Sequence, residues 1–195
     1  MAIFTTERRS IIIFTVIFLC LAISLGEARG ETRSAALEDI VVTSTRDSLL
    51  VYLTVTNCFN EAIVEAIENG IPTSFLFFIK LYGKKSLWWD REVESLTVTH
   101  EIKYDNLRKL YSVRRFNGEE SVTSTADFEE AKKLMSEIVG LRLVDLDSLE
   151  KGKKYKVSMM AQLDKVELPF ALRQIFFFVK LWDFKTPWYN MEFIY

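Results

Sequence analysis

The sequence predicts a mainly β domain with two amphipathic helices, of the α+β class, built as an antiparallel β-sandwich or a strongly bent sheet. Three observations predict this class. Long segments alternate apolar and polar residues with a period of two, which is typical of strands that bury one face. Two short segments instead carry apolar residues at helical spacing. Turn-forming pairs separate several strand segments, and the spacing predicts about eight to ten strands in one domain.

The chain opens with the pattern of an export signal. Arg8 and Arg9 precede a fifteen-residue apolar run over residues 11–25, which ends in small residues. Because the run is shorter than the roughly 20 residues that cross a bilayer, cleavage near residues 24–28 is favoured over permanent anchoring. We therefore predict that residues 1–26 are a signal peptide or an N-terminal membrane segment. The protein is expected to be exported, and either periplasmic or tethered to the inner membrane by this segment.

Residues 27–195 are predicted to form a single β-rich domain. They carry 23 basic and 26 acidic residues, and this mildly acidic balance argues against nucleic acid as a partner. Cys58 is the only cysteine after the leader, so this segment has no internal disulfide. The core must therefore supply the stability, and the 15 Phe and 4 Trp residues of the chain offer large apolar area for it.

Strand alternation is clearest in residues 49–55, 75–81, 96–104 and 155–163. After the third of these segments, Asp and Asn at residues 105–106 are typical of a two-residue hairpin loop. Such a loop would place His100 opposite Tyr111 and Val98 opposite Val113.

A second hairpin is indicated by Asn and Gly at residues 117–118, since both residue types tolerate the positive φ of a tight turn. A two-residue loop here would place Val113 opposite Val122. Val98, Val113 and Val122 are then expected to form one layer of a three-stranded meander.

Two helices are predicted between the strands. Asn60 is placed to cap a helix over residues 61–68, and Gly70 to end it. A second helix is predicted over residues 127–139, ended by Gly140. Each has one apolar stripe, so both are expected to lie on the sheets.

Residues 168–182 are ambiguous because residues 175–179 are apolar on every face, and the pattern fits a buried strand as well as a buried helix. This region also takes part in a weak internal similarity, because residues 78–90 resemble residues 178–190 at an offset of one hundred. An internal duplication would account for it and would place Trp88 and Trp188 in equivalent positions.

Motifs for the common cofactors and metals are absent. The chain has one histidine, which excludes the usual zinc sites, and it has no nucleophile elbow, phosphate-binding loop or dinucleotide fingerprint. We expect no cofactor, no metal and no catalytic residue assignable from motifs.

Three residues remain as possible functional groups. His100 lies on the apolar face of its segment, where a general base and a hydrogen-bonded structural histidine are the two alternatives, and Tyr111 is its expected partner. Cys58 precedes a helix N-terminus, which can lower a thiol pKa, although a lone buried cysteine more often acts as a small apolar residue.

The most distinctive candidates for binding are the tryptophans Trp88, Trp89, Trp182 and Trp188. Neighbouring residues on a strand point to opposite sides, so Trp88 and Trp89 do not share one core. Exposed tryptophans would indicate contact with a protein partner, a glycan or a membrane, whereas burial would make them structural.

The chain resembles a bacterial family of exported proteins known as domain-of-unknown-function family 4390. The resemblance is carried by LTVTNCFN at residues 53–60, GIPT at 70–73, SLW at 86–88, TVTHEIKYD at 97–105, LPF at 168–170 and WDF at 182–184. It spans nearly all of the chain after the leader. It implies a signal-bearing envelope protein without an assigned activity, sometimes encoded beside an envelope-sensing histidine kinase, and it transfers no site residues.

These observations favour a non-catalytic envelope module that binds a protein partner or a ligand, and the resemblance suggests a membrane sensor kinase and envelope sensing as the partner and the role. Membrane contact would come through the N-terminal segment if it is not cleaved. The alternative is an exported hydrolase that uses His100 or carboxylates near strand ends. Those carboxylates are Asp90, Glu92, Glu94, Asp105 and Asp183. The sequence leaves the question of catalysis open.

Overall fold

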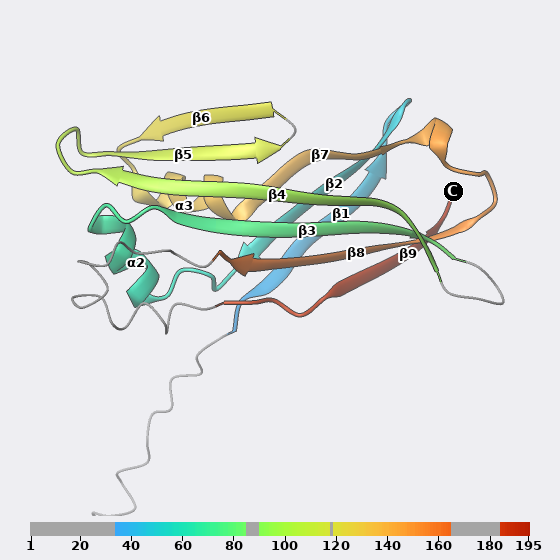
Figure 1. Ribbon diagram of the computed structural model, residues 1–195, viewed down its shortest axis with the longest axis horizontal. Helices are drawn as coiled ribbons and strands as arrows, with labels where there is room; N and C mark the ends of the chain where they lie inside the picture. The colour runs from blue at the N-terminus through green and yellow to red at the C-terminus, as the bar shows by residue number, and fades with distance from the viewer. Residues whose placement is uncertain (1–33, 85–89, 118, 165–183) are drawn as a thin grey trace, which may run out of the picture. The chain divides into compact units, whose positions relative to one another are not determined.

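The computed structural model describes residues 34–84, 90–117, 119–164 and 184–195, and this part of the chain forms two antiparallel sheets with two α-helices (Figure 1). The three-stranded sheet has the order β1 (Ala36–Ser44), β2 (Ser48–Thr56), β7 (Glu137–Asp145). The six-stranded sheet has the order β6 (Glu119–Thr125), β5 (Leu110–Asn117), β4 (Arg91–Asp105), β3 (Thr73–Gly83), β8 (Lys154–Leu163), β9 (Tyr189–Ile194). The helices are α2 (Glu61–Glu68) and α3 (Phe128–Ser136), and a 3-10 turn, η1 (Leu146–Ser148), follows β7. The predicted mainly β class with two helices is confirmed, and the two separate sheets favour the sandwich over a single bent sheet.

The core is built on one face of β3. Phe75, Phe77, Ile79 and Leu81 are fully buried there, while the residues between them are half-exposed. This face packs into one apolar cluster with side chains from β2, β7, α2 and α3. All four segments with period-two alternation are strands, and three of them bury one face. In the middle of β8 both faces are buried, because Ser158 and Met160 are covered as well.

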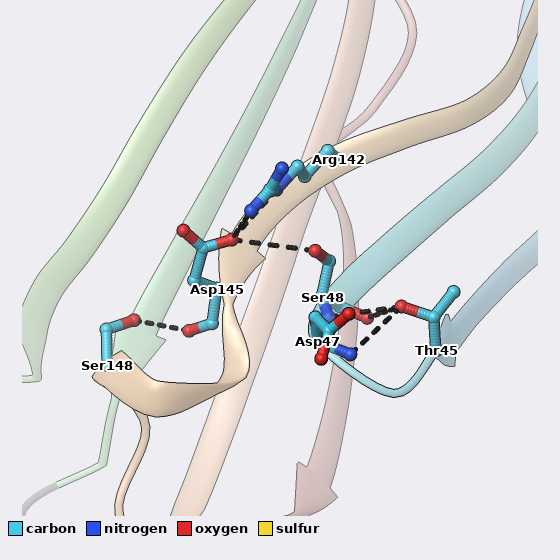
Figure 2. Close-up of polar contacts among 6 residues, drawn as sticks. All are labelled: Thr45, Asp47, Ser48, Arg142, Asp145 and Ser148. Atoms are coloured by element: carbon cyan, nitrogen blue, oxygen red, sulfur yellow. Dashed lines mark hydrogen bonds and ion pairs between the residues drawn. The ribbon is translucent and has the colours of Figure 1, made fainter.

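A set of polar contacts joins the turn between β1 and β2 to the end of β7 (Figure 2). The Thr45 hydroxyl accepts from the backbone N–H of Ser48 at 3.1 Å. Across the sheet, Asp145 Oδ1 accepts from Arg142 Nε at 2.8 Å and from the Ser48 hydroxyl at 3.5 Å. The Ser148 hydroxyl donates to the Asp145 carbonyl at 2.6 Å. These contacts hold the exposed end of the three-stranded sheet in register.

The helix α2 forms as predicted. Asn60 Oδ1 accepts from the backbone N–H of Ile63 at 2.9 Å, and Gly70 lies at φ +76°, where a side chain would be strained. The buried residues Ile63 and Ile67 attach the helix to the core. Its predicted bounds and both end signals are confirmed.

The second helix was predicted too long. It ends at Ser136 rather than Val139, and the chain passes directly into β7 at Glu137. Ile138 pairs with Leu53 of β2, so strand pairing overrides the helical stripe in these residues. Gly140 does not end the helix but lies inside β7 at φ +65°, against the Tyr52 side chain.

The first hairpin register was wrong by four residues on β5. Asp105 pairs with Leu110, so four residues form the turn instead of two. The Asp105 carboxylate explains the longer turn, because its Oδ1 accepts from Leu107 N at 2.9 Å and from Arg108 N at 3.0 Å. His100 therefore lies opposite Arg115, not Tyr111.

The predicted register of the second hairpin, between β5 and β6, was wrong by one residue. Asn117 pairs with Glu119, which places Val122 opposite Arg114 rather than Val113. A shift of one residue turns a strand over. Val122 is accordingly 56% exposed, and it does not share a layer with the buried Val113.

Several predictions lie outside the described residues: the choice between helix and strand for residues 168–182, and most of the similarity between residues 78–90 and 178–190. The leader also lies outside them. Within the part that is described, no helix is long and apolar enough to span a membrane.

The cap of α2 gives a test of this fold. Replacing Asn60 by Ala removes the acceptor for the Ile63 N–H and should lower the free energy of unfolding by about 1 kcal/mol in urea denaturation. Asn60→Asp is the matched control, since it keeps an acceptor and should stay within a few tenths of the wild-type value. Equal stability of the Ala and Asp variants would contradict the capping role.

Candidate functional site

His100 lies on the buried face of β4, where only 2% of it is exposed. Its ring centroid is 4.8 Å from that of Phe77 on β3, and its Nδ1 is 3.1 Å from the Met135 carbonyl in the last turn of α3. A carbonyl only accepts, so in the neutral ring the Nδ1 carries the proton and Nε2 does not. The histidine thus bonds the sheet to the helix.

Burial lowers the pKa of His100 from 6.5 to about 4, and the nearby positive charge of Arg115 acts in the same direction. The bond to Met135 opposes this shift but does not cancel it. The imidazole is therefore neutral at neutral pH.

A cavity of about 210 Å³ lies beside His100. It is lined by His100, Arg115, Asn117, Ser121, Glu137, Ile138 and Val139. Three of these residues lie side by side on neighbouring strands, because Arg115 pairs with His100 on one side and with Ser121 on the other. Glu137 and its neighbours come from the first residues of β7. Because α3 ends at Ser136, these β7 residues, and not a further helical turn, form the opposite wall.

Arg115 is the unusual residue of this cavity. Its Nε is buried and has no hydrogen-bond partner within the described part of the chain. Buried donors in folded proteins are almost always paired, so an unpaired guanidinium nitrogen in a side chain that lines a polar cavity makes this cavity a candidate binding site.

The cavity does not assemble the groups that hydrolysis needs. Ser121 is two strands from His100, which is about 10 Å between their backbones, and Arg115 lies between them. A nucleophile must lie within hydrogen-bond distance of its base. Of the acidic residues considered from the sequence, Asp90 pairs with Lys156 at 2.9 Å and Glu92 with Lys80 at 3.5 Å. Both ion pairs lie near the start of β4, eight or more residues along the strand from His100. Asp183 lies outside the described residues.

Tyr111 is not near His100 in the strand pairing. It lies opposite Tyr104, with ring centroids 4.5 Å apart, and 5.0 Å from the ring of Phe128 on α3. Burial raises the pKa of its phenol. In this aromatic stack Tyr111 packs α3 against the sheet.

Cys58 is buried between β2 and α2, with its Sγ 3.4 Å from the Val55 carbonyl. Burial raises the pKa of its thiol from 9.0 to about 12, and this outweighs the lowering by a backbone hydrogen bond and by the charge of Lys132. The thiol stays protonated at neutral pH, and its surroundings are those of a small apolar residue.

Among the four tryptophans, Trp188 is the one that the structure describes; Trp88, Trp89 and Trp182 lie outside the described residues. Trp188 is 44% exposed and immediately precedes β9. Because β9 and β6 are at opposite ends of the six-stranded sheet, Trp188 and the cavity are separate surfaces.

The sequence reasoning missed Arg115 and Glu137. A signal for Arg115 was available, since it continues the buried alternation of Tyr111 and Val113, where a charged residue is unexpected. Glu137 had no such signal because the helical pattern continues through it. No group of three metal-binding side chains occurs among the residues that the structure describes.

The buried imidazole predicts a specific pH dependence. Because the folded-state pKa is below the unfolded value, the unfolded chain binds a proton first as the pH falls from 6.5 towards 4, and stability is lost in that window. The free energy of unfolding should fall by about 2 kcal/mol more for the wild type than for His100→Gln between pH 7 and 4.5. His100 is the only histidine, so urea denaturation at the two pH values isolates its contribution. Equal pH slopes for the two proteins would contradict the lowered pKa.

A family model for a domain of unknown function (DUF4390) matches residues 32–192, which include all the described strands except the last two residues of β9. No curated protein and no solved structure matches the chain. The match covers most of the sequence and contains both the cavity and Trp188. The protein therefore belongs to the DUF4390 family.

Proposed function

We propose that this protein is exported to the cell envelope, where its β-rich domain acts as a non-catalytic interaction module that docks an extended segment of a protein partner along β9. The observation that carries the proposal is the exposed aromatic pair at the start of that strand, Trp188 at 44% and Tyr189 at 40%. Tyr and Trp are enriched at the centres of protein interfaces, where large apolar rings gain the most from losing water.

The rest of β9 extends this surface. Ile194, at its other end, is 66% exposed. The strand pairs with β8 on one side, and no other strand of the described residues pairs with its second side. An edge of this kind offers unpaired backbone N–H and C=O groups to an extended chain, and exposed side chains add specificity.

The other three edge strands of the described sheets, β1, β6 and β7, are less suited to such pairing. The register of β7 against β2 shifts at two places, and its Gly140 takes a positive φ of 65°. β1 has a bulge between Glu38 and Val41, where Asp39 takes a positive φ of 50°. β6 begins with the charged residues Glu119 and Glu120. Bulges and charges at an edge discourage strand addition. The pairing of β9 with β8 is regular, and the one charged residue of β9, Glu192, forms an ion pair with Lys84.

Export is supported by the order of charged, apolar and small residues in the leader. The partner is then a protein of the same compartment, and a membrane sensor kinase is the kind of partner that the family resemblance favours. A non-catalytic role is supported by the separation of Ser121 and the strand-end carboxylates from His100.

The leader can be tested directly. Expression of the full chain in a cell with a secretory pathway should yield a mature protein that begins between residues 25 and 29, as measured by intact mass and N-terminal sequencing. Replacing Ile17 by Arg interrupts the apolar run and should leave the full-length chain inside the cell. A chain that starts at Met1 outside the cytoplasm would support the anchored alternative, and one that stays in the cytoplasm would contradict export.

The docking surface is tested by placing a photocrosslinking amino acid at position 188 and irradiating intact native cells. One partner should be captured reproducibly, and Trp188→Ala should reduce its co-purification at least about tenfold, the usual effect of removing a central interface aromatic. The matched control is position 122, because Val122 is also exposed but lies on β6 at the opposite edge.

Crosslinking at position 122 should capture no partner. The Val122→Ala variant should not reduce co-purification of the partner. Capture of the same protein with equal yield from both positions, or no reproducible capture from 188, would contradict docking at β9. Unchanged thermal unfolding of Trp188→Ala confirms that the variant is folded.

A further inference from the structure

The cavity beside His100 has two charged side chains on facing walls, and neither has an ion-pair partner among the residues that the structure describes. Arg115 comes from β5 and Glu137 from the start of β7, and both line the same 210 Å³ space. Neither side chain forms an ion pair within the described part of the chain, although Arg114, the neighbour of Arg115, has two. Arg115 and Glu137 are therefore available to opposite charges or dipoles of one bound molecule.

The guanidinium of Arg115 determines which chemical group the cavity can bind. Arg115 lines the cavity, and the two terminal nitrogens of a guanidinium can direct a pair of N–H donors at one bound group. A carboxylate matches this pair with its two oxygens, and such bidentate pairs are among the strongest hydrogen bonds in proteins. The neutral His100 adds no competing positive charge.

Glu137 restricts the choice further. A carboxylate only accepts hydrogen bonds, so it favours a ligand with an N–H donor and repels one that carries two negative charges, such as phosphate. At roughly 30 Å³ per water molecule, the cavity holds about seven waters, which is the size of a small organic group.

We propose that this cavity binds an α-amino or α-amido carboxylate, with the carboxylate held by Arg115 and the adjacent N–H by Glu137. This chemistry belongs both to a free amino acid and to the C-terminal residue of a peptide. Ser121 and Asn117 lie at the same cavity and supply further hydrogen-bond donors. The site is independent of the docking surface at β9, because it is formed at the other end of the six-stranded sheet.

The test measures the ¹H–¹⁵N NMR signal of the Arg115 Nε–Hε group in the full domain during titration with four small probes. N-acetylglycine has both the carboxylate and the amide N–H, acetate lacks the N–H, and N-acetylglycinamide lacks the carboxylate. Glycine carries an ammonium group in place of the amide. N-acetylglycine should shift the Arg115 signal saturably, acetate should bind at least threefold more weakly, and N-acetylglycinamide should not bind.

Titration with glycine distinguishes a free amino acid from the C-terminal residue of a peptide as the ligand. Tighter binding of glycine than of N-acetylglycine assigns the site to free amino acids, and the reverse order assigns it to peptide C-termini. Both results support the shared chemistry. Equal shifts with N-acetylglycine and N-acetylglycinamide, or no saturable shift with any probe, would overturn it, and these measurements need no variant.

Variants then locate the binding. Arg115→Gln should weaken N-acetylglycine binding at least tenfold, read from backbone amide signals around Ser121. Arg114→Gln is the matched control, because Arg114 is the adjacent residue and pairs with Glu101 and Glu120 instead of lining the cavity; it should change nothing. Glu137→Gln should remove the preference for N-acetylglycine over acetate.

An unchanged dissociation constant in Arg115→Gln would overturn the proposal. If that variant does not fold, Arg115→Lys replaces it, because a lysine keeps the charge but cannot form the bidentate pair. It should weaken binding by at least threefold, and full retention would count against the site. Loss of binding at this cavity leaves crosslinking at position 188 unaffected, so the two proposals fail separately.

Discussion

The packing of the inner face of β3 is the interaction on which the rest of this structure depends. Phe75, Phe77 and Ile79 are fully buried, and the strand pairs along most of its length with both β4 and β8. Phe75 also contacts Phe59 and Phe184, with ring centroids 5.2 Å and 4.8 Å apart, so three distant segments meet on one ring. Large aromatic rings supply here the apolar area that a domain without a disulfide needs.

The candidate site is a consequence of where this packing ends. Near β5, α3 packs on the inner face of the sheet, where Phe128 of the helix contacts Tyr111 of β5. The helix ends one residue after the buried Met135. The next turn of chain is the start of β7, which stands opposite Arg115 and leaves the cavity between them. His100 closes the inner wall, because its bond to the Met135 carbonyl fixes the last turn of the helix. The polar site therefore borders directly on the core.

The sequence predicted those features that depend on local chemistry. The strand faces follow from alternation, and the bounds of α2 follow from Asn60 and Gly70. It failed at two places, one where a side-chain contact lengthens a turn and one where pairing with a distant strand ends a helix. At the first hairpin the Asp105 carboxylate stabilises a four-residue turn, and at the end of α3 the pairing of Ile138 with Leu53 ends a helix that the stripe would continue. Both errors moved charged residues to the wrong place, which is why Arg115 and Glu137 were not among the candidate residues, whereas His100 and Trp188 were.

The direct passage from α3 into β7 limits how this chain can change in length. Ser136 ends the helix and Glu137 begins the strand, with no residue between them to absorb an insertion. One added residue would exchange the buried and exposed faces of β7 and would turn Ile138 and Leu141 away from the core. In the turn between β4 and β5, by contrast, Leu107 is almost fully exposed and an added residue disturbs no packing. Members of the family are therefore expected to differ in length at that turn and to keep a constant spacing between α3 and β7.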